Sequence, residues 1–196
     1  MPSGDAAIKI LVVCTGNICR SPMAEGLLRA RLAERGVVAT VSSAGLTWEG
    51  RSATPEAIRA ASAYGVDLRE HRSRILDPAH LADADLILAM ERRHVREVVA
   101  AAPDRFARTF TLAELVRRGN AIGSRPTGVA VAAWLAHVGA GRRPESQLGF
   151  ATDDDIADPY GRPLAAYEKT VTDLDALVAR LVELLWSAAT SVEEAS

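Results

Sequence analysis

The sequence predicts an α/β fold with three layers, in which helices cover both faces of a four-stranded parallel sheet. Short runs of Ile, Leu and Val alternate along the chain with longer helical patterns, and glycine or proline stands at many of the junctions. Strands separated by helices imply parallel pairing through crossover connections. The size agrees, because 196 residues, of which 48% are apolar, suit one domain with a single core.

The first half of the chain supplies two strands and two helices. The run at 8–13 is rich in Ile, Leu and Val, which is typical of a strand buried on both faces. A helix is expected from Ser21, a capping residue followed by proline, to Gly36, which ends it. A second strand is expected at 37–43, and a second helix at 54–64 begins with Thr-Pro.

The second half adds two strands and a long final helix. In chain order we expect a short helix opened by Asp77 and Pro78, a strand at 85–90, a helix at about 92–102, a strand at 108–112 and a helix at about 163–187. The stretch 119–155 fits the alternation worst, because an Ala- and Val-rich helix around 129–137 is followed by a polar loop. We therefore expect one domain over 1–190 with an insertion at 119–155, and a disordered tail at 191–196.

Charge and cysteine usage argue against several kinds of partner and site. With 23 basic and 25 acidic side chains, nothing indicates binding to nucleic acid or to a membrane. No run approaches the roughly 18–20 apolar residues of a membrane span, and the first residues lack a basic signal region, so we expect a cytoplasmic protein. Cys14, Cys19 and four scattered histidines show no metal-ligand spacing, so we expect no metal and no other cofactor.

The segment from Cys14 to Ser21, Cys-Thr-Gly-Asn-Ile-Cys-Arg-Ser, predicts an oxyanion site. It joins a strand to a helix start, where backbone N–H groups converge on an anion-binding concavity. Gly16 permits a positive φ, and Asn17 is among the residues that tolerate one best. Arg20 adds a planar fork that can hold two oxygens of a phosphate. Parallel α/β sheets place their ligands at this position, after the carboxyl end of a strand.

Cys14 leaves the strand at the base of this site. Helix N-termini and neighbouring cations stabilise a thiolate, so we expect Cys14 to be a nucleophile aimed at phosphorus. Ser21 can donate its hydroxyl to the sulfur. The alternative is a tight turn that contains a buried structural thiol.

A second catalytic group is needed, because expelling an alcohol or phenol from phosphorus is helped by a general acid. Asp158 is the best candidate, since Pro159 stiffens its loop and Tyr160 can flank a substrate ring. The alternative is that Asp-Pro merely begins a turn before the last helix.

Three segments together resemble the low-molecular-weight protein tyrosine phosphatase family: Cys14 to Pro22, Ser42-Ser43-Ala44-Gly45 and Asp158-Pro159-Tyr160. The resemblance covers about 9–90 and about 156–185. It implies the Rossmann-like phosphotyrosine phosphatase I fold and the hydrolysis of phosphotyrosine in proteins through a phosphocysteine. It also implies a phosphotyrosine protein as partner, with a bacterial tyrosine kinase as one candidate.

Carried over by position, the resemblance implies that Cys14 is the nucleophile, that Arg20 binds phosphate, and that Asp158 acts first as acid and then as base. It assigns phosphate or substrate binding to Thr15, Gly16, Asn17, Ile18, Cys19, Ser21, Trp48 and Tyr160, and a supporting role to Ser43 and His71. Cys19 matches a loop cysteine that can form a reversible disulfide with the nucleophile. The alternative for Cys19 is a small buried hydrophobe.

Two residues depart from the family pattern, and three other functions stay open. Glu91 stands where members often have Asp, and Gly161 stands where some have a second aromatic residue. Arsenate reductases of this fold use two further cysteines, whereas none follows Cys19 here. Arginine phosphatases tend to carry Thr at the position of Ile18. The third alternative is an adaptor that binds phosphate without catalysis.

Overall fold

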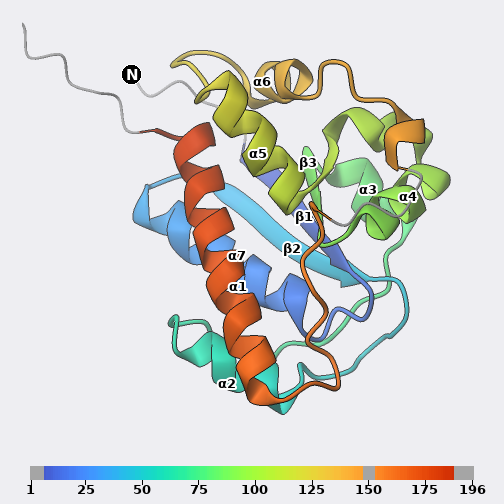
Figure 1. Ribbon diagram of the computed structural model, residues 1–196, viewed down its shortest axis with the longest axis vertical. Coiled ribbons are helices and arrows are strands. Elements are labelled where there is room, and N and C mark those ends of the chain that lie inside the picture. The colour runs from blue at the N-terminus through green and yellow to red at the C-terminus, as the bar shows by residue number, and fades with distance from the viewer. Residues whose placement is uncertain (1–6, 148–152, 188–196) are drawn as a thin grey trace, which may run out of the picture.

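The computed structural model describes residues 7–147 and 153–187. Its sheet contains four parallel strands: β1 (Ile8–Cys14), β2 (Ala39–Gly45), β3 (Leu86–Ala89) and β4 (Thr109–Thr111). The order across the sheet is β2-β1-β3-β4, and helices cover both faces (Figure 1). This arrangement confirms the predicted three-layer α/β fold.

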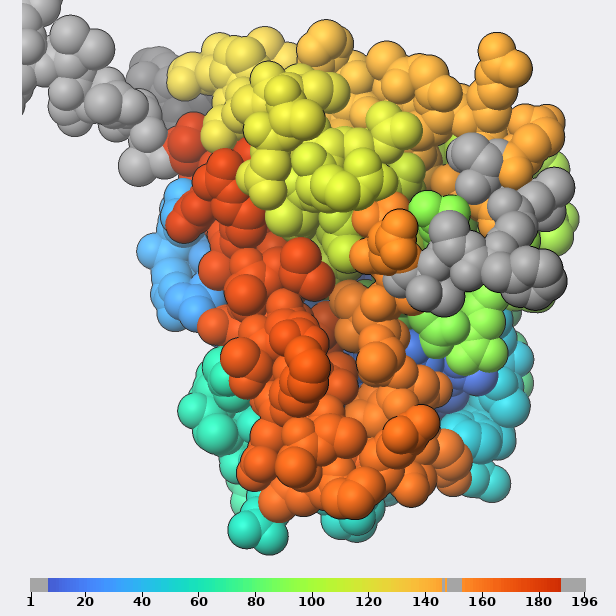
Figure 2. Space-filling view, in the orientation of Figure 1, coloured from blue at the N-terminus to red at the C-terminus, as the bar shows by residue number. Residues whose placement is uncertain are grey.

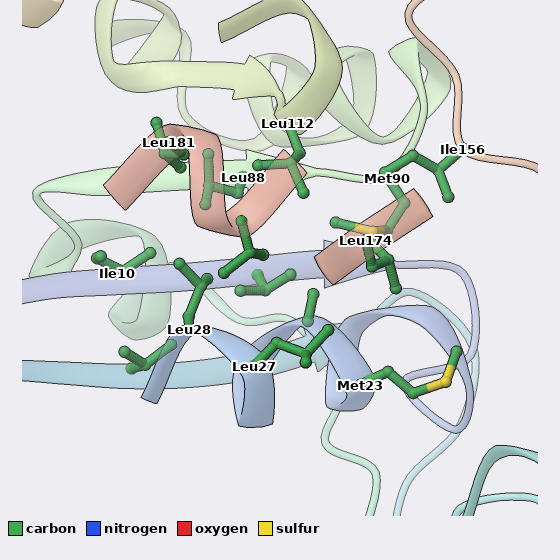
Figure 3. Close-up of a cluster of buried hydrophobic side chains, with 14 of the residues drawn as sticks. Ile10, Met23, Leu27, Leu28, Leu88, Met90, Leu112, Ile156, Leu174 and Leu181 are labelled. Carbon is green, nitrogen blue, oxygen red and sulfur yellow. The ribbon is translucent and has the colours of Figure 1, made fainter. Parts of the chain in front are cut away.

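Alternate side chains of β1 enter two different cores, because successive residues of a strand point to opposite faces. Ile10 and Val12 belong to a core that also contains side chains of the helices α1 (Arg20–Glu34), α2 (Pro55–Ser62), α5 (Leu112–Ile122), α6 (Val131–Val138) and α7 (Leu164–Leu185). Leu11 and Val13 pack on the other face, with α3 (Pro78–Asp83) and α4 (Arg92–Ala101). Figure 3 shows the larger core, where Leu28 of α1 and Leu181 of α7 lie near Ile10.

The helix α5 was not predicted from the sequence. The strand predicted at 108–112 extends too far, because its last residue belongs to this helix. The strand β4 stops at Thr111, whose hydroxyl accepts a hydrogen bond from the backbone N–H of Glu114 at 3.0 Å. This is an N-cap, and Thr followed three residues later by Glu is a known helix-start pattern. Leu112 therefore begins a helix instead of ending a strand.

The remaining boundaries differ from the predictions by a few residues. The second strand runs from Ala39 to Gly45 because its register pairs Ile8 with Ala39 and Cys14 with Gly45. Ser21 does not cap α1, contrary to the prediction: it lies inside the first turn, and its hydroxyl serves the site described below. No helix in the described ranges is long and apolar enough to cross a membrane.

The predicted insertion at 119–155 is closely packed on the rest of the domain where the structure describes it. Gly119 lies inside α5, and a Cβ added there would stand 2.8 Å from Leu184 of α7. The short 3-10 helices are η1 (Pro103–Arg108) and η2 (Pro144–Gln147). Asp154 pairs with Arg117 of α5 at 2.8 Å. Whether this stretch is an insertion stays a prediction, and the tail predicted at 191–196 lies outside the described residues.

A buried ion pair ties the end of this stretch to α5. The side chains of Arg142 and Glu114 are 2% and 6% exposed, and they meet at 2.9 Å. The Arg142 guanidinium also stacks on Phe106 at 4.5 Å and on Phe110 at 3.8 Å from the ring centroids. Burial lowers the pKa of Arg142, and the carboxylate of Glu114 counteracts that shift.

Replacing Glu114 by leucine should lower the free energy of unfolding by about 3–5 kcal/mol, because it leaves a buried guanidinium without its counter-charge. Urea unfolding measures the change. The double variant Glu114→Leu/Arg142→Met is the control, and it should recover much of the loss because neither charge remains. A single variant as stable as the wild type would show that the guanidinium of Arg142 does not depend on the carboxylate of Glu114.

Candidate active site

The loop between β1 and α1 wraps around the sulfur of Cys14. The backbone N–H of Asn17 donates to Cys14 Sγ at 3.2 Å, and Ser21 Oγ lies 3.0 Å from the same atom. Asn17 has a φ of +51°, which makes it the one non-glycine residue with a positive φ in the described ranges. The left-handed conformation is therefore present at Asn17, where it turns this amide toward the sulfur, whereas Gly16 does not use the positive φ that its residue type permits.

The side chain of Asn17 fixes the loop to its surroundings. Its Nδ2 donates to Ser21 Oγ at 2.9 Å and to Ser43 Oγ at 2.7 Å, and its Oδ1 accepts from the backbone N–H of Arg74 at 2.9 Å. Its carbonyl oxygen lies 2.7 Å from His71 Nε2. Ser43 in turn donates to the carboxylate of Glu25 in α1. The structure thus places Ser43 and His71 against Asn17, as the family resemblance implies.

The end of β2 leaves no room for a side chain beside this loop. A Cβ added to Gly45 would lie 2.8 Å from the backbone nitrogen of Asn17, which is closer than real Cβ atoms approach. Glycine is required here because the loop and the strand touch through their backbones. The residues Ser43 and Gly45 of the motif at 42–45 therefore position the loop.

Arg20 lies on the other side of the pocket, with its side chain only 1% exposed. One terminal nitrogen donates to the carboxylate of Glu91 and to the carbonyl of Ile156, the latter at 2.9 Å. The other donates to Asp158 at 2.6 Å, while Nε has no partner among the described residues. The guanidinium therefore joins the strand end at Glu91 to the segment before α7 and keeps one buried donor for an oxyanion.

The predicted residue Thr15 belongs to a second hydrogen-bonded group, whose other members Glu91, Arg93 and His94 were not predicted as site residues. The nitrogen Nδ1 of His94 accepts from the backbone N–H of Glu91 at 3.1 Å, so Nε2 carries the ring proton and donates to Thr15 Oγ1 at 3.0 Å. Arg93 donates to the same hydroxyl at 2.7 Å and pairs with Glu91 at 2.7 Å. The carboxylate of Glu91, whose position departs from the family pattern, thus holds both arginines.

The pKa values of two members of this group show which charges persist. Burial pushes the pKa of Glu91 up, but hydrogen bonds from Arg93 and Arg20 outweigh it and leave the pKa below its usual value. Burial lowers the pKa of His94 from 6.5 to about 3; the carboxylate of Glu91 opposes this shift, and the nearby arginines add to it. The group therefore contains a carboxylate and a neutral imidazole at neutral pH.

Replacing His94 by glutamine should make the protein less sensitive to acid. Between pH 6.5 and about 3 the unfolded chain binds a proton at His94 that the folded chain does not. The free energy of unfolding therefore falls as the pH is lowered, by about 1.4 kcal/mol per unit for this group. Urea unfolding at pH 7 and 5 should show that the wild type loses about 2 kcal/mol more than His94→Gln. An equal loss in the two proteins would contradict the assignment.

A small pocket of about 60 Å³ opens above the sulfur. Its walls are Cys14, Thr15, Gly16, Ile18, Cys19, Arg20, Trp48, Asp158 and Tyr160. The rings of Trp48 and Tyr160 are 5.5 Å apart between centroids and inclined at 55°. Figure 2 shows the segment before α7, in orange, beside the cyan residues that follow β2 at the lower right. Every predicted catalytic and binding residue lines the pocket except Asn17 and Ser21, which hold the loop from behind.

The thiol of Cys19 is directed toward α2 and α7. It lies 3.5 Å from Thr54 Oγ1 and 3.9 Å from the hydroxyl of Tyr167. Burial raises the pKa of Cys19 to about 11, so this thiol is protonated at neutral pH. Both cysteines are free, and a regulatory disulfide between them stays a prediction.

Taken together, the pocket can carry out nucleophilic chemistry on a phosphate ester. A sulfur held by a backbone amide and a hydroxyl faces a cavity that contains a guanidinium and a carboxylate. These are the parts needed to attack phosphorus, stabilise the charge on its oxygens and protonate a leaving group. Within residues 7–147 and 153–187 there is no group of three or more His, Cys, Asp or Glu side chains that could hold a metal ion.

Comparison with known proteins identifies the family. The model of the family described as low molecular weight phosphotyrosine protein phosphatase matches residues 9–122. A protein-arginine-phosphatase from Geobacillus stearothermophilus is 33% identical over 178 residues, which are 90% of this chain and 95% of that protein. A probable low molecular weight protein-tyrosine-phosphatase, EpsP of Ralstonia nicotianae, is 32% identical over 163 residues, with 83% and 85% covered.

A solved structure agrees with the sequence relatives. The low molecular weight protein tyrosine phosphatase from T. tengcongensis matches with a TM-score of 0.69 and 34% identity, and the match covers 91% of this chain and all of that one. Fold, loop sequence and site geometry lead to one conclusion: this chain belongs to the low molecular weight protein tyrosine phosphatase family and is a phosphatase.

Proposed function

We propose that this protein hydrolyses phosphotyrosine in proteins through a phosphocysteine on Cys14. The observation that carries the proposal is the shape of the pocket: the sulfur lies at its base, and the rings of Trp48 and Tyr160 stand at its walls, 5.5 Å apart. An aromatic substituent can pack against these rings, with Ile18 as a further apolar contact. We propose a cytoplasmic setting, in which thiols stay reduced, and a bacterial tyrosine kinase as one candidate substrate.

In the first step Cys14 Sγ attacks phosphorus, so that a sulfur–phosphorus bond forms and the bond to the tyrosine oxygen breaks. Asp158 is held at the pocket by Arg20 and by the backbone N–H of Tyr160, which donates to it at 3.1 Å. From there, in its protonated form, it gives its proton to the departing oxygen. Arg20 and the loop amides stabilise the negative charge that spreads over the three remaining oxygens.

In the second step water attacks phosphorus and the sulfur departs as a thiolate. Asp158, now ionised, takes a proton from the water, so that inorganic phosphate leaves and both groups return to their initial states. The hydroxyl of Ser21 and the amide of Asn17 stabilise the departing sulfur, since both already lie within hydrogen-bond distance of it. Because these two contacts stabilise the thiolate, they help Cys14 both to attack phosphorus and to depart from it.

Phosphoarginine is the second candidate substrate, because a protein-arginine-phosphatase is 33% identical over 90% of this chain. The isoleucine at position 18 favours phosphotyrosine, since it offers the pocket an apolar contact and no hydroxyl. Arsenate reduction and an adaptor role are the remaining alternatives.

A comparison of rates decides among these functions. Wild type and Cys14→Ser are assayed side by side on a phosphotyrosine peptide, a phosphoarginine peptide and arsenate with a thiol reductant. We expect the wild type to have its highest kcat/KM on phosphotyrosine and Cys14→Ser to be inactive on all three. Faster release of phosphate from the phosphoarginine peptide would show that phosphoarginine is the preferred substrate. No turnover of any of the three compounds would favour the adaptor.

A further inference from the structure

The loop that follows β2 holds one arginine in a fixed place beside the pocket. Gly50, two residues after Trp48, has a φ of +71° in a bend of the chain. The backbone N–H of Arg51 then donates to Ser73 Oγ at 2.9 Å, and the carbonyl of Arg51 accepts from the Ser73 N–H at 2.8 Å. The backbone at Arg51 is therefore anchored, although its side chain is exposed.

The side chain of Arg51 is held by the pocket wall itself. Its guanidinium carbon lies 4.6 Å from the ring centroid of Trp48, the distance of a cation–π contact. The ring of Trp48 is fixed in turn, because it fills the space over Gly16, where a Cβ would lie 2.6 Å from it, and it contacts Tyr160. Stacking on a fixed ring orders a long side chain before any ligand arrives, which lowers the entropic cost of binding.

The charge of Arg51 is not compensated within the described part of the chain. Its guanidinium makes no hydrogen bond and no ion pair there, and its one side-chain interaction is the stacking on Trp48. The other two arginines at the site differ, because Arg93 pairs with Glu91 at 2.7 Å and Arg20 pairs with Glu91 and Asp158. Arg51 is thus an ordered, solvent-exposed cation whose five N–H donors are open.

We propose that Arg51 binds a carboxylate of the substrate protein next to the phosphorylated residue, so that the enzyme prefers phosphotyrosine in an acidic sequence. This inference rests on the proposed function. Arg51 is not part of the pocket wall, so its ligand lies outside the phosphate site, where the neighbouring residues of a bound peptide run. A planar guanidinium pairs with a carboxylate through two parallel hydrogen bonds, which a lysine cannot reproduce.

Two phosphotyrosine peptides that differ only in Glu or Gln on both sides of the phosphorylated residue test the proposal. The wild type should have a kcat/KM about two- to fivefold higher for the Glu peptide, mainly through KM, as expected for an exposed ion pair. The preference should shrink with added salt. Arg51→Gln should abolish it, and Arg51→Lys should keep part of it, because the charge remains while the fork is lost.

The matched control is Arg35→Gln, which removes the same charge from an exposed arginine just beyond α1. The length of α1 places this residue about 20 Å from the phosphate-binding loop at the other end of the helix. Arg35→Gln should therefore keep the preference for the Glu peptide. Equal rates on the two peptides in the wild type, or a preference that survives in Arg51→Gln, would overturn the role of Arg51 and leave the proposed function standing. No turnover of either peptide, with turnover of phosphoarginine, would overturn both.

Discussion

Replacing Cys14 by serine should reduce the turnover of an aryl phosphate such as 4-nitrophenyl phosphate by about 10⁴-fold or more. A serine hydroxyl is a much weaker acid than a thiol, and one amide and one hydroxyl cannot keep it ionised. The substitution changes little else, since oxygen replaces sulfur at a buried position whose contacts are hydrogen bonds to Asn17 and Ser21. Steady-state kinetics measures the loss.

The same variant should still bind inorganic phosphate, because the amides of the loop and the Nε donor of Arg20 remain in place. Titration calorimetry on both proteins tests this point. Loss of turnover with retained phosphate binding would show that the sulfur is needed to form the bond to phosphorus and not to build the loop. Loss of both would indicate that the serine has disturbed the loop.

The second cysteine provides the control. In Cys19→Ser the hydroxyl takes the place of a protonated thiol that contacts Thr54 and Tyr167, so the loss of turnover should be far smaller. Mass spectrometry of the acid-quenched wild-type reaction should find the phosphoryl group on the peptide that contains Cys14. Cys14→Ser turnover within tenfold of the wild type, or a phosphoryl group on another residue, would contradict the nucleophile assignment.

The phosphate-binding loop is predictable from sequence because the contacts around its sulfur are local. The sulfur, the amide of Asn17 and the hydroxyl of Ser21 all lie within eight consecutive residues, and the strand before them and the helix after them carry their own signals. The backbone conformation of Asn17 follows from its residue type. Little information from the rest of the chain is needed to place these groups.

Asp158 and Ser43 are different, because their positions depend on the whole fold. The pairing of Asp158 with Arg20 spans 138 residues, and Asp-Pro by itself predicts only a turn. Before the structure, Pro159 and Tyr160 made Asp158 only a candidate, and the family resemblance implied its role as the acid. The structure supplies the physical reason: the backbone N–H of Ile156 donates to the carbonyl of Met90, which brings the segment to the end of β3.

The group around Glu91 was missed although the sequence held a signal for it. The register of β1 and β3 pairs Val13 with Ala89, so the residues that follow both strands emerge side by side. In a parallel sheet the residues just beyond the strand ends form the ligand site, and this rule applied to the third strand points to Glu91. The role of His94 was harder to predict, since a lone histidine in a helix usually has no such contact.

Replacing Asp158 by asparagine should slow the release of poor leaving groups by about 10²–10⁴-fold, because the amide cannot give up a proton in the transition state. Phenyl phosphate and phosphotyrosine, whose phenolates leave poorly, should show the full effect. 4-Nitrophenyl phosphate should show much less, since its phenolate leaves readily without a proton. The measured quantity is kcat/KM, which reports the steps up to the first irreversible one and is not limited by hydrolysis of the phosphocysteine.

A series of aryl phosphates with different leaving phenols measures this contrast as the slope of a plot of rate against leaving-group pKa. The logarithm of kcat/KM should fall more steeply with the pKa of the leaving phenol in Asp158→Asn than in the wild type, because unassisted departure places more charge on the oxygen. Asp155→Asn is the matched control. It removes a nearby carboxylate, which accepts from the backbone N–H of Arg92 at 2.7 Å, and it should leave the slope unchanged. Equal slowing of all substrates in Asp158→Asn would exclude Asp158 as the acid.

The ion pair between Asp158 and Arg20 predicts a second consequence of the same substitution. In the free enzyme the carboxylate occupies one terminal nitrogen of the guanidinium at 2.6 Å, which is a donor that phosphate needs. Asparagine bears no charge and competes for that donor less strongly, so inorganic phosphate should inhibit Asp158→Asn at lower concentrations than the wild type. Slower release of poor leaving groups together with tighter phosphate binding would show that only the acid has been lost. A collapsed pocket would instead slow catalysis and weaken phosphate binding.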